Sequence, residues 1–260
     1  MRNTAIIIPC FNEERRLPQE EFVLFARQHP DVHFIFVNDC SSDGTRQVID
    51  GLCARRPRQL MGLHLPQNLG KAGAVREGFL QAFAGDYAAI GFWDADLATP
   101  LAAIASFGSL LAGSQLTMVI GARVRLLNRH IARRVARHYL GRVFATMASF
   151  VLGLTVYDTQ CGAKLFANTP MLRQVFAKPF TVNWVFDVEI LARYLLLIRH
   201  QGGEPLATSA CEYPLEEWRD VPGSKLKVRD FVVAIYEMVR IWAILHGPSS
   251  KSYFEWLVES

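Results

Sequence analysis

The chain of 260 residues is poor in the features that identify several common protein classes. Its five cysteines are an odd number without a Cys-x-x-Cys pair, which argues against a disulfide framework or a zinc site and favours reduced thiols. No uncharged apolar run approaches the roughly 20 residues that span a bilayer. The apolar run Ala5–Ile8 is too short for a signal-peptide core and is followed at once by Pro9. We therefore expect no transmembrane anchor and a cytoplasmic protein.

The common phosphate-binding motifs are also missing. No Gly-x-x-x-x-Gly-Lys-Ser/Thr loop is present, and Pro9-Cys10-Phe11-Asn12-Glu13-Glu14 stands where a dinucleotide-binding Gly-x-Gly-x-x-Gly would follow the first strand. A haloacid-type phosphatase would carry threonine at the position of Ala98. A bound nucleotide would have to be held by separate strand ends.

Excess charge is absent as well. The net charge is +4, so the overall balance does not predict a nucleic-acid partner. Hydrophobic residues make up 51% of the chain and the mean hydropathy is +0.15, which allows a sizeable core in one large domain, alone or with an appendage.

What the first half does contain is a regular series of short apolar runs with helix-compatible stretches between them. The expected strands are Ala5–Ile8, His33–Val37, Met61–Leu65, Ala88–Trp93 and Leu116–Ile120. Strands that alternate with helices imply right-handed crossovers and a mostly parallel sheet. The fold class is therefore α/β.

Polar residues follow each expected strand. They include Glu13, Asp39, Lys71, the pair Asp94 and Asp96, and Arg123. Ligands of open α/β sheets bind outside the carboxyl ends of the strands, so these side chains are expected to face one crevice. Singly, each has an ordinary alternative: Asp39 in a turn, Glu13 in a first helical turn, or Lys71 as a solvated side chain. A lysine at a helix start opposes the helix dipole, however, which points to a nearby anion.

Asp94 and Asp96 directly follow an apolar run that is expected to be a buried strand. Residues two apart in extended chain point to the same side, so both carboxylates can converge on one divalent cation that bridges phosphate oxygens. The alternative is a pair of aspartates in a turn or at a helix cap before Pro100.

Four stretches of the first half occur in a fixed order: Pro9-x-x-Asn12-Glu13, Val37-Asn38-Asp39 with Ser42-Asp43-Gly44-Thr45, Asn68-x-Gly70-Lys71-x-Gly73-Ala74-x-Arg76-x-Gly78, and Asp94-Ala95-Asp96. Three more follow: Asp158-Thr159-Gln160-Cys161-Gly162-Ala163-Lys164-Leu165-Phe166, Trp184-Val185-Phe186-Asp187-Val188-Glu189, and Gly223-Ser224-Lys225. The first set resembles family 2 glycosyltransferases with the GT-A fold, and the second resembles their dolichyl-phosphate β-glucosyltransferase branch. The resemblance spans about residues 4 to 246. The departures are Cys40 and Ala72 in place of glycine, Ala163 in place of phenylalanine, and the missing amino-terminal membrane anchor of the eukaryotic enzymes.

The resemblance implies a nucleoside diphosphate sugar as the donor, with UDP-glucose expected. Pro9 to Glu13 would pack beside the nucleotide, and Asp39 would contact the uracil. Asp94 would face the ribose or metal-bound water, and Asp96 would ligate Mg²⁺ or Mn²⁺, which stabilises the charge of the leaving diphosphate. Lys71 and Arg123 would add contacts to phosphate oxygens.

The acceptor implied by the resemblance is a polyprenyl phosphate. A phosphate monoester is already anionic near pH 7, so it has little need of a general base and needs positive charge instead. Gln160 and Lys164 are expected in a loop that faces the sugar and the acceptor phosphate. Asp187 is a base or acceptor-orienting group, or else an exposed acid in a helix that starts near Trp184. Cys161 is expected to be a packed thiol.

Two segments of the second half suggest a membrane surface. Arginines gather between residues 123 and 142, and Arg129, Arg133 and Arg137 recur every four residues, as on one helix face that is either simply solvated or binds anionic lipid. The uncharged run Val143–Tyr157 suits a buried or interfacial helix. Nucleic acid is not expected, because the basic face lacks interleaved aromatic residues.

The carboxyl-terminal segment has an amphipathic pattern. Its apolar arc consists of Val228, Phe231, Val232, Ile235, Met238, Val239, Trp242 and Leu245, and its polar side of Lys227, Arg229, Asp230, Glu237 and Arg240. The arc either covers the core or inserts shallowly into a membrane.

The sequence thus predicts a GT-A domain over residues 1–224, with a nucleotide-sugar half (1–125) and an acceptor half (126–224), and an amphipathic segment over 225–260. The expected activity is inverting, metal-dependent transfer of glucose from UDP-glucose to a polyprenyl phosphate by a protein peripheral on the cytoplasmic face of a membrane. The alternatives are another nucleotide sugar, a saccharide acceptor, a nucleotidyltransferase, and a non-catalytic protein that binds a nucleotide sugar or lipid phosphate.

Overall fold

The structure is a computed structural model that describes residues 3–124, 127, 130–132, 135–219 and 228–259, with the backbone alone described for 132, 135–140 and 228–231. It divides into two compact units. The first consists of Met1–Val119 and Gly162–Asn168, and the second of Ile120–Cys161 and Thr169–Ser260. Each unit is described by itself below. The domain boundaries expected from the sequence stay a prediction, and the one after residue 224 falls outside the described residues.

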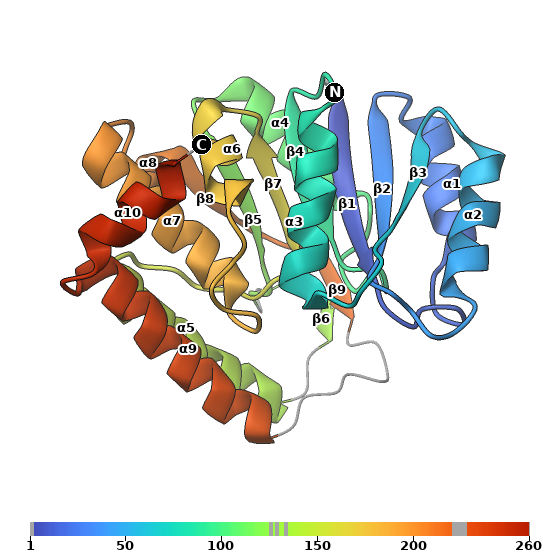
Figure 1. The fold of residues 1–260 in the computed structure, drawn as a ribbon. Coiled ribbons are helices and arrows are strands. Elements are labelled where there is room, and N and C mark those ends of the chain that lie inside the picture. The colour runs from blue at the N-terminus through green and yellow to red at the C-terminus, as the bar shows by residue number, and fades with distance from the viewer. Residues whose placement is uncertain (1–2, 125–126, 128–129, 133–134, 220–227, 260) are drawn as a thin grey trace. The chain divides into compact units, whose positions relative to one another are not determined.

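The first unit is built on a mostly parallel sheet (Figure 1). Its strands β1 to β4 and β7 occur in the order β3-β2-β1-β4-β7, with β7 antiparallel to β4 and the other pairs parallel. The elements of this unit are β1 (Thr4–Cys10), α1 (Gln19–Gln28), β2 (Val32–Asn38), α2 (Thr45–Arg55), β3 (Leu60–His64), α3 (Gly70–Phe83), β4 (Ala89–Trp93), α4 (Ala103–Gly113) and β7 (Ala163–Ala167). β5 (Met118–Ala122) begins at the end of this unit. The α/β class is confirmed, and the five strands expected in the first half lie within two residues of their predicted bounds.

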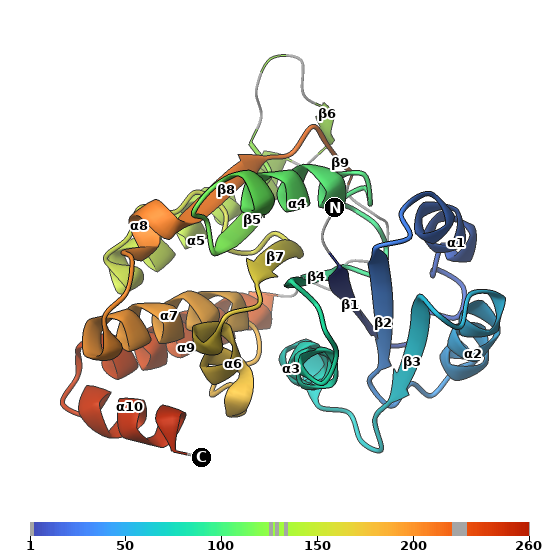
Figure 2. The same cartoon turned by 90° about the horizontal axis from the view of Figure 1, so that it is seen from above.

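Helices cover both faces of this sheet. Figure 2 shows α1 and α2 on one face and α3 on the other. Beneath α1, the ring of Phe22 packs edge-on against Phe34 and Phe36 of β2, with centroids 5.3 and 5.0 Å away. Side chains buried on both faces explain why β1, β2 and β4 have nearly continuous apolar sequences rather than alternating ones.

One glycine of α3 allows that helix to lie close to the sheet. A Cβ atom on Gly78 would stand 2.5 Å from Cγ2 of Ile7 in β1, well inside contact distance. Glycine at this position therefore follows from the close packing of helix on strand.

The second unit is mainly helical. It contains β6 (His130–Ala132), α5 (Val135–Leu152), α6 (Pro170–Ala177), α7 (Phe186–Gln201), α8 (Leu206–Ser209), β8 (Ala210–Pro214), β9 (Glu217–Arg219), α9 (Val228–His246) and α10 (Ser250–Val258). Helices α5, α7 and α9 pack against one another, and α10 packs on α6 and α9.

The segment around His130 corrects one prediction. A single basic helix face was expected to run through Arg129, Arg133 and Arg137, but His130–Ala132 is a strand that pairs in parallel with β9, and the helix begins at Val135. Ile131 is buried opposite Trp218, and burial of this apolar pair outweighs the helical spacing of the arginines. Arg129 and Arg133 lie outside the described residues, and of Arg137 only the backbone is described.

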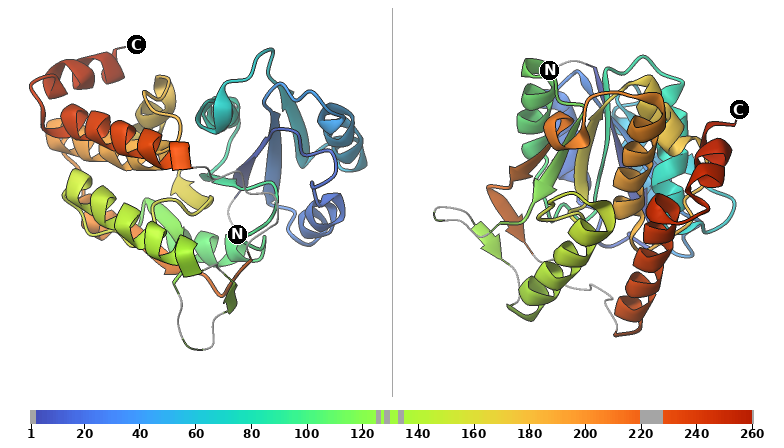
Figure 3. Two further views of the ribbon diagram at one scale, coloured as in Figure 1. Left: turned by 90° about the horizontal axis from the view of Figure 1, so that it is seen from below. Right: turned by 90° about the vertical axis from the view of Figure 1, so that its left-hand side faces the viewer.

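Helices α5 and α9 run side by side and begin at the same end of the pair (Figures 1 and 3). The inner side of α9 buries Ala234, Met238, Ile241 and Leu245. The predicted apolar arc is therefore only partly a core face: Val232, Ile235, Val239 and Trp242 are exposed. Glu237 was expected on the polar side, and the structure buries it instead. Among the described residues, no helix is both long enough and apolar enough to cross a membrane.

Candidate active site

The carboxyl ends of β1, β2, β3 and β4 lie along one edge of the first sheet, because these four strands are parallel. The loops at three of these ends contain a left-handed residue other than glycine: Asn12 (φ 55°), Cys40 (φ 53°) and Leu97 (φ 50°). No further residue of this kind occurs in the described part of the chain. Left-handed backbone is strained for such residues and tends to cluster at functional sites.

The loops after β1 and β2 are tied together by side-chain hydrogen bonds. The N–H of Asn12 donates to Oγ of Ser41 (3.0 Å), and Oδ1 of Asn12 accepts the N–H of Ser42 (3.0 Å). The N–H of Glu13 donates to Oγ1 of Thr45 (2.8 Å) at the start of α2. These bonds fix the segment from Pro9, which lies within β1, to Glu13.

Asp39 occupies the end of β2. Its Oδ1 accepts the N–H of Leu69 (2.7 Å), and its carbonyl oxygen accepts from the side-chain amide of Asn68 (3.0 Å). Burial raises the pKa of Asp39, and the N–H groups of Leu69 and Gly70 partly oppose this rise. The loop that carries Lys71 is thereby joined to Asp39.

Asp94 lies in a tight environment at the end of β4. Its Oδ1 forms an ion pair with Nζ of Lys71 (2.6 Å), and its N–H donates to the carbonyl oxygen of Gly162 (2.9 Å). A Cβ atom at Gly162 would stand 1.8 Å from Oδ2 of Asp94, so a larger residue there would displace this carboxylate from its position.

Asp96 follows in a turn that its own neighbours stabilise. Its Oδ1 accepts the N–H of Ala98 (3.1 Å), and the indole N–H of buried Trp93 donates to the carbonyl oxygen of Thr99 (3.1 Å). Burial raises the pKa of Asp96, and the negative charge of Asp94 raises it further, against the opposing effects of Ala98, Lys71 and Arg16.

The residues at this edge suit a divalent cation. Within the described residues no group of three or more His, Cys, Asp or Glu side chains is arranged to hold a metal. Two half-buried carboxylates, two positions apart in the chain, supply the oxygen ligands that Mg²⁺ and Mn²⁺ prefer, with the remaining positions left to phosphate oxygens and water. Asp96, with Asp94 beside it, would hold such an ion.

Arg123 lies in the second unit, where it forms a bidentate ion pair. Its Nε and Nη2 donate to the two oxygens of Asp158 at 2.6 and 2.7 Å, and its guanidinium lies 5.3 Å from the ring centroid of Trp218. Glu212 accepts the N–H groups of Tyr157 and Asp158, which holds this pair in place.

The loop after Asp158 contains two polar groups without a partner among the described residues. They are the buried Nε2 atom of Gln160 and Oγ1 of Thr159. Buried donors without partners are costly, and a ligand rich in hydroxyl or phosphate oxygens would satisfy them. The neighbouring Cys161 is fully buried, which confirms the prediction of a packed thiol.

Two predicted site residues differ from expectation in their surroundings. Lys164 is not in a loop but in β7, where it is 1% exposed and its Nζ lies 5.1 Å from the ring centroid of Phe92 in the paired strand. The residues after Gly162 pair with β4 as a strand, so the predicted loop ends before Lys164. Asp187 lies in the first turn of α7 and is 5% exposed, so its alternative interpretation as an exposed acid is wrong.

The sequence did not point to two residues that the structure brings into these clusters. The Arg16 side chain pairs with the carboxylate of Glu13 and acts on the charge of Asp96. The spacing of Glu13 and Arg16, three positions apart, could have predicted this ion pair from the sequence. Asp158 was part of a recognised motif but had no assigned role, since only the structure shows that Arg123 lies 35 positions earlier beside it.

Comparison with known proteins identifies the family of this chain. The model of the family described as "Glycosyl transferase family 2" matches residues 5–174. The chain belongs to this family. The dolichyl-phosphate beta-glucosyltransferases of Saccharomyces cerevisiae and Drosophila melanogaster are 31% and 33% identical to it over 240 residues, which cover 85% of this chain and 68% of each relative.

Solved structures show the same fold. Glucosyl-3-phosphoglycerate synthase from Mycobacterium tuberculosis, in complex with phosphoglyceric acid, matches with a TM-score of 0.64 at 15% identity and covers 95% of this chain and 80% of that one. Another structure of that enzyme contains Mn²⁺ and UDP-glucose. The GT-A fold predicted for this glycosyltransferase is thereby confirmed.

The backbone of Cys40, where the resemblance led us to expect glycine, is left-handed, with φ of 53°. The loop keeps its shape in spite of the side chain because the N–H of neighbouring Ser41 donates to Oδ1 of Asn38 (3.1 Å).

Proposed function

We propose that this glycosyltransferase moves glucose from UDP-glucose to a polyprenyl phosphate, with inversion at the anomeric carbon and with Mg²⁺ or Mn²⁺ bound. The observation that carries the proposal is the charge arrangement at the end of β4, where Asp94 and Asp96 stand beside the cation of Lys71. The names of the relatives at 31% and 33% identity support the choice of glucose and of a lipid phosphate.

On the donor side, the residues of the first unit bind and orient the nucleotide. Asp39 accepts the uracil N–H, and the segment from Pro9 to Glu13 packs beside the base. Asp96 would hold a divalent ion, whose positive charge would stabilise the leaving diphosphate. Lys71 exchanges its contact with Asp94 for a phosphate oxygen, and Asp94 faces the ribose.

On the acceptor side, the amide of Gln160 donates to an oxygen of the sugar or of the acceptor phosphate. Lys164 of the first unit carries a buried ammonium, and Arg123 of the second unit, oriented by Asp158, is a further cation for phosphate oxygens of the donor. An acceptor phosphate needs no proton removed, so Asp187 orients the acceptor in this scheme. A saccharide hydroxyl is the second candidate acceptor, and Asp187 in the first turn of α7 would be its base.

We assign contact with the membrane to the helix pair α5 and α9. Their exposed apolar residues include Val143 and Phe150 of α5 and Val232, Ile235, Tyr236, Val239 and Trp242 of α9; Phe150 is 78% exposed. Valine and isoleucine with flanking tyrosine and tryptophan are suited to shallow insertion at a lipid interface. The protein would be peripheral on the cytoplasmic face of a membrane, near its lipid acceptor.

The test is incubation with UDP-[¹⁴C]glucose, Mn²⁺ and a polyprenyl phosphate in vesicles, followed by partition into organic solvent. We expect the label in the organic phase and release of UDP. Label that stays in the aqueous phase would contradict a lipid acceptor. In parallel incubations, transfer from GDP-mannose but not from UDP-glucose would contradict the donor, and transfer to a saccharide but not to the lipid would contradict the acceptor. Chelation of the metal with EDTA should abolish transfer, and Mn²⁺ should restore it.

A further inference from the structure

The loop Thr181–Val185, which leads into α7, is held from inside by two buried carboxylates. Oε2 of Glu189 accepts the N–H groups of Thr181 (2.8 Å) and Val182 (3.0 Å). Glu237 of α9 accepts those of Asn183 (3.0 Å), Trp184 (2.9 Å) and Val185 (3.0 Å). Five consecutive backbone N–H groups therefore donate to two side chains that are distant in sequence from each other.

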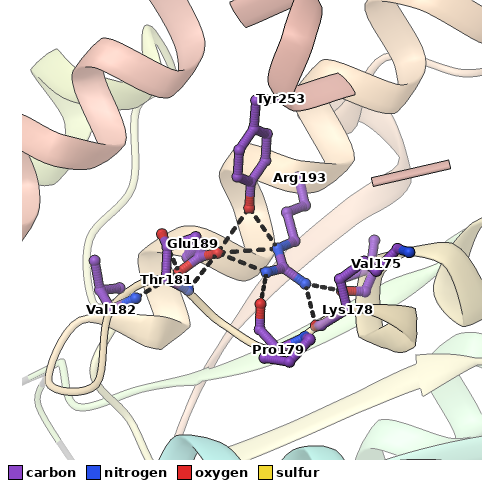
Figure 4. A network of polar contacts seen from close by, with 8 residues as sticks. All are labelled: Val175, Lys178, Pro179, Thr181, Val182, Glu189, Arg193 and Tyr253. Carbon is purple, nitrogen blue, oxygen red and sulfur yellow. Dashed lines mark hydrogen bonds and ion pairs between the residues drawn. The ribbon is translucent and has the colours of Figure 1, made fainter. Parts of the chain in front are cut away.

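Arg193 neutralises the first of these carboxylates and extends the network (Figure 4). Its guanidinium is fully buried and pairs with Oε1 of Glu189 (2.7 Å), while it also donates to the carbonyl oxygens of Val175, Lys178 and Pro179. The hydroxyl of Tyr253 in α10 donates to Glu189 (2.8 Å). A buried ion pair of this kind is costly to dehydrate, and it specifies one backbone conformation only when its hydrogen bonds are satisfied, as they are here.

The opposite side of the loop presents side chains to solvent. Trp184 is 40% exposed, although large aromatic side chains are usually buried, and Asn183 beside it is exposed. Asp187 follows within the first turn of α7. The inward bonds thus leave the loop with a fixed backbone and an exposed indole.

Helix α9 joins this loop to the exposed apolar surface. Glu237 points inward to the loop, whereas Tyr236 and Val239 on the same helix are exposed. An acceptor that arrives from a lipid phase along α9 would be near the loop.

We propose that Glu237 and Glu189 are positioning residues for the acceptor: they hold Thr181–Val185 so that Trp184 contacts the apolar chain of a polyprenyl phosphate. The inference rests on the proposed function for the identity of the acceptor. It adds that α9 and α7, rather than the donor-binding loops of the first unit, determine how well the acceptor is used.

The first test compares Glu237→Gln with Arg199→Gln. Arg199 of α7 donates to the carbonyl oxygen of Leu245 in α9 (2.7 Å), so its substitution also removes a bond between the two helices but does not touch the loop. A glutamine amide turns its own NH₂ group toward at least one of the three N–H donors. We expect faster amide hydrogen exchange at residues 183–185 in Glu237→Gln alone, with the affinity for UDP unchanged in both variants.

Kinetics then tests the role in positioning. For Glu237→Gln we expect roughly a tenfold fall in kcat/KM for the polyprenyl phosphate, while the KM for UDP-glucose changes less than twofold. The inference is overturned if loop exchange stays at the wild-type rate, or if exchange rises and the kinetics with the acceptor do not change. A purely structural role would lower kcat in proportion to the folded fraction and leave the KM of both substrates unchanged, so the fall in kcat/KM has to come from a higher KM for the polyprenyl phosphate.

Trp184→Ala provides a variant that does not depend on the buried network. The side chain is exposed, so we expect the fold to persist. The KM for a long polyprenyl phosphate should rise about tenfold, and that for a short water-soluble prenyl phosphate less than twofold. Equal effects on both acceptors would contradict contact with the chain.

If the wild-type enzyme transfers no glucose to any lipid phosphate, the proposed function fails, whereas the exchange measurement still decides whether Glu237 holds the loop.

Discussion

The loops of the first unit that we propose bind the donor, here called the donor loops, and the loop Thr181–Val185 of the second unit are stabilised in different ways. The donor loops follow parallel strands, and left-handed residues such as Asn12 and Leu97 and hydrogen bonds between neighbouring loops define their shape. Loop Thr181–Val185 pairs with no strand and takes its shape from Glu189 and Glu237, the latter more than 50 positions away from the groups it binds. Substitutions in the first region should therefore change donor binding and chemistry, and those in the second should change use of the acceptor.

The largest effect is expected from Asp96→Asn. Loss of the carboxylate removes the proposed metal ligand, so transfer should fall at least about 1,000-fold, or roughly 4 kcal/mol in activation free energy. Release of UDP with excess Mn²⁺ measures this, and Asp50→Asn, at an exposed carboxylate paired with His64, is the control. Amide exchange at residues 181–185 should be unchanged; altered exchange there would show that the two regions are not separable.

A large effect is also expected from Gly162→Ala. The new methyl group would stand 1.8 Å from the Asp94 carboxylate, so that side chain has to move, and we expect about a 100-fold loss of transfer with a destabilisation of about 1–3 kcal/mol. Gly51→Ala is the matched control, because a Cβ atom there meets nothing within 4 Å and the helix α2 should gain about 0.5–1 kcal/mol. Chemical denaturation and the transfer assay distinguish the two variants. Wild-type activity in Gly162→Ala would exclude a role for the observed Asp94 position.

A moderate, pH-dependent effect is expected at Asp39. Burial raises its folded-state pKa above the unfolded value, so its contribution to stability is present below the unfolded pKa and is lost as the pH rises through the folded pKa. Asp39→Asn should therefore melt at the same or a higher temperature than the wild type at pH 7. It should bind UDP about tenfold more weakly, because the carboxylate is the proposed acceptor of the uracil N–H.

Calorimetric titration with UDP between pH 4.5 and 7.5 completes this test. Wild-type affinity should rise with pH as Asp39 ionises, at a pH above the usual range for aspartate, and the variant should lack this dependence. The exposed Asp86 gives a control in Asp86→Asn. A flat wild-type profile would argue against Asp39 as the uracil ligand.

The smallest effect is expected from Cys40→Gly. Glycine adopts φ of 53° without strain, and part of this gain is offset by the entropy of the unfolded chain, so stability should rise by about 0.5–1 kcal/mol. Activity should stay within about twofold of wild type. A loss of stability would mean that the contact of the Cys40 thiol with the Pro66 carbonyl oxygen matters more than the strain.

The same contrast explains how much the sequence could predict. Apolar runs bounded by polar residues located five strands and placed Asp39, Lys71, Asp94 and Asp96 at strand ends, because both features depend on nearby residues. The sequence could not place Lys164 in a strand or pair Arg123 with Asp158, since both require long-range packing. Glu237 shows the limit most clearly: helical periodicity assigned it to solvent, yet it is buried because three backbone N–H groups of a distant segment need an acceptor.

The position of Tyr253 near the carboxyl terminus has a consequence for the order in which parts of the structure form during synthesis. The chain emerges from its amino terminus, so residues 181–185 leave the ribosome well before their partners Glu237 and Tyr253 are synthesised. Until then the pair of Glu189 and Arg193 lacks its phenol, and three N–H groups of the loop lack their carboxylate. The first four strands of the donor side can already pair at that stage, whereas the loop reaches its final form only when the last two helices have been synthesised.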